Sequence, residues 1–390
     1  MEQLGATCIL RSRRVVTGDR IRPAEVVIAG GRVADVVVRR DGGFSTPSAA
    51  SGAMLHDVDD LLVAPGLVDT QINGAGPVDL RRDPAGLASL CAAAARHGVT
   101  TLLATLPSHD LDRALVGELG DAAAVMRRVE GEAPVATVAG LHLEGPFLAP
   151  ARAGAHRLAD LRPIDAEIVQ AWARDPFVAM VTLAPELDGA IEAIETLTAS
   201  GTVAAIGHTD AERGHVSAAV DAGARHVTHL WNAMAGLHHR APGVVGAALT
   251  DERITAGLIC DGAHVDPLVV RLSWQAMGPE RLVLVSDAVA SPETAHPGDG
   301  AAVIGADGTL QGSTTMLDQG VRNLIAFAGA SEVDALATAT RNPARLLGRS
   351  DLGVLAPGAR ADIVVFDDDL VPVHVMIGGR WTPDPGSPGS

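Results

Sequence analysis

The feature that most constrains this chain is a series of eight apolar segments of strand length that alternate with alanine-rich segments of helical character. Helical sequences such as PAGLASLCAAAARHG and DAERGHVSAAVDAG follow several of them. Eight consecutive β-then-α units favour a closed (β/α)8 barrel over an open doubly wound sheet. We therefore predict an α/β fold with a TIM-like barrel over residues 63–348. The strand candidates are LVAPGLVDTQI, GVTTLLATL, VATVAGLHLE, FVAMVTLAP, VAAIGHT, HVTHLW, ITAGLICD and RLVLVSD. The last two helices are expected in LDQGVRNLIAFAG and SEVDALATATRNPARLLG.

Both ends of the chain have a different pattern, in which short apolar runs are broken by Gly and Pro. Such runs, CILRSRRVV near the beginning and ARADIVVFDDDLVPVHVMIGGRW near the end among them, predict short antiparallel strands. We expect residues 1–62 and 349–382 to combine into one small β-sandwich-like domain. Residues 44–56 are expected to form a surface loop, and residues 383–390, rich in Pro, Gly and Ser, a flexible tail.

Composition narrows the classes of partner. The 390 residues are 47% hydrophobic but 2% aromatic, with no tyrosine, which predicts an aliphatic core. A formal net charge of -17 argues against general nucleic-acid binding, because no net positive field displaces counterions from phosphates. No apolar run is long enough for a membrane span, so we expect a cytoplasmic protein. The three cysteines are far apart in sequence and predict neither a disulfide framework nor a thiolate zinc site.

Ionisable side chains fall at the carboxyl ends of the strand candidates. Glu144 ends VATVAGLHLE, His208 follows VAAIG, His229 lies in HVTHLW, and Asp287 closes RLVLVSD. The strands of a parallel barrel all open onto one face at these ends, so the four groups should converge. A single histidine at a strand end is more often structural, and Glu144 alone could cap a helix. Groups from three separate strands indicate a metal site instead.

Glu144, His208 and His229 form a suitable donor set for a catalytic divalent metal that keeps one position open for water. We expect zinc first, although iron, cobalt and manganese accept the same donors. Such a metal lowers the pKa of bound water from 15.7 toward about 7. Asp287 is then the candidate general base and acid, with a helix N-cap as its alternative role.

The ordered motifs PGLVDTQING, GLHLEGPF, IGHTDA, THLWNAM, CDGAHV, LVSDA and PGARADIVVFD resemble those of the N-acetylglucosamine-6-phosphate deacetylase family of the amidohydrolase superfamily. The resemblance extends over nearly the whole chain. It implies metal-dependent hydrolysis of the acetamide of N-acetylglucosamine 6-phosphate to glucosamine 6-phosphate and acetate, in amino-sugar metabolism. It also implies that Glu144, His208 and His229 hold the metal, that Asp287 is the catalytic residue, and that the protein is a homodimer.

The family has two forms of the first barrel strand, and TQING is similar to one of them. Some members carry His-x-His there and hold a second metal, whereas others carry Gln-x-Asn and use one. Neutral amides are weak metal ligands beside imidazole or carboxylate. We therefore expect about one divalent metal per chain, with Gln71 and Asn73 binding water or substrate.

The resemblance further implies a set of substrate contacts. Asn232, Ala233 and Arg240 match positions that approach the sugar phosphate, and the arginine often comes from a neighbouring subunit. His264 and His156 match histidines near the sugar. Arginine suits phosphate because its planar fork gives two parallel charge-assisted bonds. The alternative for Arg240 is a solvated loop residue, and for the two histidines it is loop packing.

The chain departs from the family at two places near the expected site. The loop AVASPETAHPGDGAAVIG after Asp287 is unlike that of relatives, and two alanines in GPFLAPARAGAH stand where lysines are common. The exact sugar therefore stays open. The alternatives are a deacetylase of N-acetylgalactosamine 6-phosphate or of another N-acyl amino sugar, or a barrel without catalysis. Asp261 is expected to be a structural carboxylate at a strand end.

Overall fold

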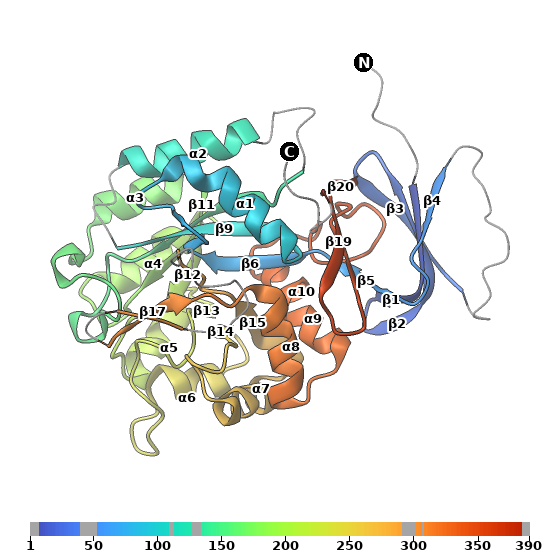
Figure 1. Ribbon diagram of the computed structural model, residues 1–390. Helices are drawn as coiled ribbons and strands as arrows, with labels where there is room; N and C mark the ends of the chain where they lie inside the picture. The colour runs from blue at the N-terminus through green and yellow to red at the C-terminus, as the bar shows by residue number, and fades with distance from the viewer. Residues whose placement is uncertain are drawn as a thin grey trace.

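The computed structural model describes residues 8–39, 53–108, 113–126, 134–290, 302–305 and 308–383, and the structural statements below refer to these. Figure 1 shows a barrel surrounded by helices, with a smaller β-structure on one side that is built from the first and last strands of the chain. Of the expected tail, only residue 383 lies in the described ranges. Within those ranges, none of the helices is long and apolar enough to cross a membrane.

The predicted barrel is confirmed, with eight parallel strands in the order β15-β14-β13-β12-β11-β10-β9-β6. Each strand candidate overlaps one of them, and only β9 extends beyond its candidate, by one residue. The sheet closes between its first and last strands, where the amide of Asp287 donates to the carbonyl of Gln71 over 2.9 Å and Ile72 bridges to Ala288. The strands are β6 (Leu67–Ile72), β9 (Val99–Pro107), β10 (Thr137–Glu144), β11 (Val178–Leu183), β12 (Val203–Ile206), β13 (His226–Val227), β14 (Thr255–Ile259) and β15 (Leu282–Val285).

Helices follow these strands and cover the outside of the barrel. The single helix expected over SEVDALATATRNPARLLG is two, because the backbone at Thr340 leaves the helical region with φ -129° and ψ -83°. Helix α9 begins at a Ser331 cap, whose hydroxyl accepts from the amide of Asp334. The helices are α1 (Leu87–Arg96), α2 (Arg113–Met126), α3 (Ala166–Arg174), α4 (Ala190–Ala199), α5 (Arg213–Asp221), α6 (Gly243–Thr250), α7 (Pro267–Arg281), α8 (Leu317–Ala328), α9 (Glu332–Ala339) and α10 (Arg341–Leu346).

The small β-structure is one sheet in the order β20-β19-β18-β5-β1-β2-β3, with β4 also pairing β1. Strands from the two ends of the chain therefore do combine, as expected. The expectation of purely antiparallel strands is wrong, since β4 and β5 run parallel to β1. The strands are β1 (Cys8–Thr17), β2 (Arg20–Ala29), β3 (Arg32–Val38), β4 (Met54–Asp57), β5 (Leu62–Pro65), β18 (Ile363–Phe366), β19 (Pro372–Ile377) and β20 (Arg380–Trp381).

Two segments near the junction differ from expectation. The candidate LVAPGLVDTQI is split at Gly66, so β5 belongs to the small sheet and β6 begins the barrel. A Cβ at Gly66 would lie 2.1 Å from the Thr100 hydroxyl, which explains why glycine stands at this crossing. Part of the expected loop 44–56 forms strand β4, and residues 44–52 lie outside the described ranges.

Candidate active site

Four side chains from separate strands meet at the carboxyl end of the barrel. Glu144 ends β10, and His208, His229 and Asp287 each follow by two residues the ends of β12, β13 and β15. All four line a single cavity of about 610 Å³. The convergence follows from the parallel barrel, because every strand delivers its end to the same face.

Glu144, His208 and His229 are buried and in mutual contact. Glu144 Oε1 lies 2.8 Å from His229 Nε2 and 3.3 Å from His208 Nε2, and the two Nε2 atoms are 3.0 Å apart. Burial would raise the pKa of Glu144, but hydrogen bonds from the two imidazoles hold it well below its usual range. The carboxylate therefore stays ionised in the centre of the cluster.

The tautomer of His208 follows from its second nitrogen. Its Nδ1 lies 3.0 Å from the carbonyl oxygen of Arg152, which only accepts hydrogen bonds, so Nδ1 carries the proton. Nε2 is consequently the nitrogen that faces Glu144 and His229, and its lone pair becomes available when a cation takes the place of the shared proton. Backbone carbonyls fix metal-binding histidines in this way.

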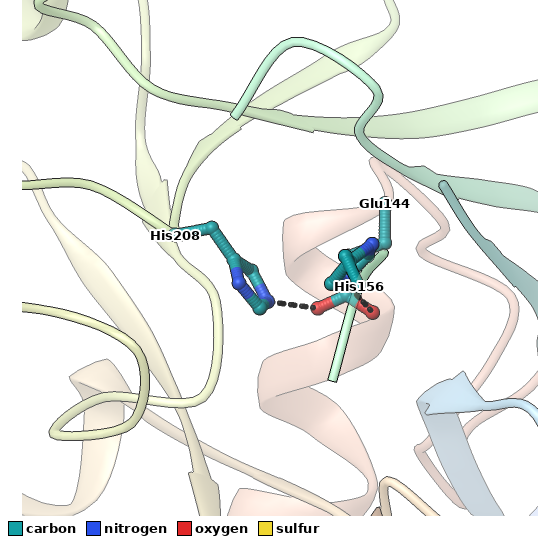
Figure 2. Close-up of side chains that lie close together, drawn as sticks. All are labelled: Glu144, His156 and His208. Atoms are coloured by element: carbon teal, nitrogen blue, oxygen red, sulfur yellow. Dashed lines mark hydrogen bonds and ion pairs between the residues drawn. The ribbon is translucent and has the colours of Figure 1, made fainter. Parts of the chain in front are cut away.

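His156 lies beside the carboxylate of Glu144. It was expected only to contact the sugar, but it is part of the group of side chains around the proposed metal position. The ligand atoms of Glu144, His156 and His208 lie within 4.8 Å of one another. Figure 2 shows the three side chains grouped around the carboxylate. The backbone amide of Ser108 donates to His156 Nδ1 over 3.0 Å, so the neutral ring carries its proton on Nε2, 4.0 Å from Glu144 Oε2. Burial lowers the pKa of His156 to about 3, which keeps the ring neutral. We infer a hydrogen-bond donor here, not a metal ligand.

The donor set fits a divalent cation. Two imidazole nitrogens 3.0 Å apart, both facing one carboxylate oxygen, require a positive species between them, either a proton or a metal. In the protein without metal, the pKa of His229 is raised, because its bond to Glu144 outweighs the effect of burial. Its Nδ1 has no partner among the described residues and can take the ring proton when Nε2 binds a cation.

The amidohydrolase family profile matches residues 62–382 of this chain. The chain belongs to the amidohydrolase family. Members are metal-dependent, which agrees with the cluster of Glu144, His208 and His229. The chain is 35% identical to N-acetylglucosamine-6-phosphate deacetylase of Bos taurus, over 92% of this chain and 91% of that protein. It is 34% identical to N-acetylgalactosamine-6-phosphate deacetylase of Escherichia coli O157:H7, over 96% and 99% of the two chains.

A solved amidohydrolase has a very similar fold. It is a mutant of N-acetyl-D-glucosamine-6-phosphate deacetylase from Mycobacterium smegmatis in complex with N-acetyl-D-glucosamine-6-phosphate. It has a TM-score of 0.83 and 35% identity, and the match covers 97% of this chain and 99% of that one. The similarity thus extends over both the barrel and the small sheet.

The two amides on the first barrel strand of this amidohydrolase bind carboxylates. Gln71 Nε2 donates to Glu144 Oε1 and to Asp287 Oδ1, each over 3.1 Å, and Asn73 Nδ2 donates to Asp287 Oδ1 over 2.8 Å. A carboxylate only accepts hydrogen bonds, so the NH₂ end of each amide must face it. Both amides therefore present N–H donors, not lone pairs for a metal, to these two carboxylates. Contacts of Gln71 and Asn73 with substrate remain a prediction.

Asp287 has an environment suited to proton transfer. Removal from water and repulsion by Glu144 raise its pKa to about 7, although His229, His264 and the Asn73 bond lower it in part. Oδ1 accepts both amides, whereas no hydrogen bond from the described residues reaches Oδ2. The free oxygen is therefore the one able to exchange a proton near neutral pH.

Asp261, expected to be a structural carboxylate, positions His264. Its Oδ2 lies 2.7 Å from His264 Nδ1 and accepts from the Ser313 hydroxyl over 2.9 Å. Its Oδ1 accepts from the amides of Ala263 and His264. The proton of a neutral His264 ring therefore lies on Nδ1, and the ring, which lines the cavity, can present its Nε2 lone pair there.

The remaining predicted contacts separate into two groups. Asn232 and Ala233 line the cavity beside the cluster. Arg240 does not line the cavity, and it is exposed before α6 with Nη1 2.8 Å from His239 Nε2. A role across a homodimer interface stays a prediction for this arginine.

Three arginines in the cavity wall were missed in the sequence. Arg81 and Arg82 follow the short strand β8 (Val78–Asp79), and Arg157 precedes the short helix η3 (Leu158–Asp160). The available signal was the sequence RRD in the segment between the first barrel strand and the helix that follows it, since loops at this end of a barrel face the site.

Backbone strain is concentrated at this site. His208, His229, Trp231, Ala233 and Asp287 adopt positive φ values of 49°, 28°, 81°, 51° and 45°. Non-glycine residues rarely occupy this region, and each costs on the order of 1–3 kcal/mol. Such conformations persist where the surrounding structure fixes them, which here aims three of the four cluster side chains into the cavity.

Proposed function

We propose that this amidohydrolase removes the acetyl group from N-acetylglucosamine 6-phosphate, giving glucosamine 6-phosphate and acetate. The observation that carries the proposal is the Glu144–His208–His229 cluster facing Asp287 in one cavity. Curated relatives of this activity match over nearly the whole chain, which supports the choice of substrate. About one divalent ion per chain, zinc first, fits the three donors.

The residues supply the proton chemistry of amide hydrolysis. A divalent cation held by Glu144, His208 and His229 would polarise the amide carbonyl and acidify water. Asp287 Oδ2 accepts a proton as water oxygen bonds to the carbonyl carbon. The same carboxyl group then returns the proton to the sugar nitrogen as the carbon–nitrogen bond breaks. Gln71 and Asn73 hold Oδ1 throughout, so that Oδ2 stays directed at the reacting atoms.

A second substrate, N-acetylgalactosamine 6-phosphate, is supported by the Escherichia coli O157:H7 relative, which is nearly as similar. The two sugars differ in the configuration of one hydroxyl group. The deciding measurement is kcat/KM for both phosphosugars and for their unphosphorylated forms. We expect the highest value for N-acetylglucosamine 6-phosphate. Failure of the metal-loaded protein to release acetate from any of the four compounds would contradict the proposed function.

A further inference from the structure

We propose that Arg81, Arg82 and Arg157, here called the rim arginines, bind the phosphate of the substrate from within the same chain. The inference rests on the proposed function and names the phosphate subsite. It differs from the contacts implied by resemblance, where an arginine at position 240 approaches the phosphate. All three rim arginines line the cavity that contains Glu144 and Asp287.

The rim arginines are accessible to an anion. Their side chains are 41%, 84% and 74% exposed, so they can reach a ligand in the open part of the cavity. The charge of Arg81 also contributes to lowering the pKa of His156.

Arg81 is held in a fixed orientation with one edge free. Its Nε and Nη2 donate to the two oxygens of Asp79 over 3.1 and 2.9 Å. No hydrogen bond from the described residues involves its Nη1. A guanidinium group held by a carboxylate on one edge can give parallel charge-assisted bonds to a phosphate on another. Prior orientation reduces the entropy lost when the ligand binds.

The local charges favour an anion here despite the net charge of -17. Arg152, which lies within GPFLAPARAGAH, is paired with Asp210 over 2.8 and 3.0 Å and does not line the cavity. Three acidic side chains line the described part of the cavity wall. Glu144 is bonded to imidazoles and Asp287 to amides. The third, Asp160, lies 3.8 Å from Arg157. Asp79 also lies 2.9 Å from Arg81 and 3.7 Å from Arg82, so the three guanidinium groups face two aspartates and leave the cavity mouth with a net positive charge.

The test compares the triple variant R81A/R82A/R157A with wild type in the metal-loaded, full-length protein. We expect KM for N-acetylglucosamine 6-phosphate to rise at least about tenfold, equivalent to roughly 1.4 kcal/mol, with a much smaller change in kcat. The inhibition constant of inorganic phosphate should rise by a similar factor. The loss on the phosphorylated sugar should exceed the loss on N-acetylglucosamine. R81Q, which keeps a polar side chain near Asp79, should give a partial effect and guards against a folding defect.

R253A is the matched control. Arg253 forms the same fork with the aspartate two residues earlier, with Nε and Nη2 bonded to Asp251 over 3.0 and 2.7 Å, but it does not line the cavity. It should leave both constants unchanged. Triple-variant constants equal to those of R253A would overturn the inference, as would an R240A variant that alone accounts for the whole loss.

The inference and the proposed function fail in different ways. If wild type hydrolyses none of the sugars, the proposed function is wrong. Phosphate binding by the rim arginines can still be tested by calorimetry, with inorganic phosphate added to wild type and to R81A/R82A/R157A. Equal phosphate binding by the two proteins would then refute the rim subsite. Weaker binding by the triple variant would support it.

Discussion

Asn73 Nδ2 lies 2.8 Å from Asp287 Oδ1. An amide at the end of the first barrel strand therefore holds the carboxylate that follows the last barrel strand. Gln71 reaches the same oxygen and also Glu144. The amide pair thereby links the proposed base to the proposed metal cluster. In the form with His-x-His at these positions, the same two side chains would be metal ligands instead.

The pH dependence of turnover should respond to Asn73. Asp287 must be ionised to accept a proton, so activity should fall as pH decreases through its pKa, which is about 7 without a cation and lower with one. The Asn73 bond lowers that pKa, so N73A should shift the acidic limb of kcat/KM to higher pH. An unchanged limb, measured from pH 5 to 9, would rule out this role for the amide.

Replacing Asp287 by Asn should abolish most of the activity without loss of metal. The amide cannot accept the proton from water, and general acid–base groups contribute about 10²- to 10⁴-fold. Turnover is measured by acetate release, and metal content by mass spectrometry. Near wild-type turnover in D287N would mean that another group moves the proton.

Wild type should contain about one tightly held divalent ion per chain. H208A should lose it, since the variant removes one of three donors. A chelator should abolish activity, and added zinc should restore it. Two tight ions in an active preparation would contradict the carboxylate-binding role of Gln71 and Asn73.

D261N should weaken catalysis through His264. Asparagine can direct its NH₂ group at His264 Nδ1 and reverse the tautomer, so that Nε2 gains a proton and loses its lone pair. We expect roughly a tenfold loss in kcat/KM, by analogy with other partners that orient functional histidines. Nitrogen chemical shifts of His264 report the tautomer directly. S313A, which removes another bond to the same oxygen, is the control and should keep the tautomer.

The contribution of Asp69 to the free energy of unfolding should decrease as pH rises, whereas that of most paired carboxylates increases. Burial raises its pKa from 3.8 to about 6, so the folded protein holds a proton there that the unfolded chain releases. Its contribution is most favourable below pH 3.8 and is lost as pH rises through about 6, by roughly 3 kcal/mol. The stability of D69N relative to wild type should therefore increase from pH 4 to 7. A constant difference in Tm across that range would show that Asp69 does not titrate there.

The barrel and its cluster could be predicted because both depend on regular features. Apolar strands alternate with helices, and Glu144, His208 and His229 lie at or just beyond strand ends. The position of His156 could not be predicted without the resemblance, since it depends on how the loop after β10 folds back over Ser108. The split at Gly66 was also hidden, because the apolar sequence continues through it.

Strand β5 pairs with β1 on one side and with β18 on the other, and the whole barrel lies between β5 and β18 in sequence. During synthesis on the ribosome, β5 emerges before the barrel strands, and β18 emerges after them. The edge of β5 that pairs with β18 therefore has no native partner until the barrel sequence has been translated, and an unpaired strand edge can pair with other chains.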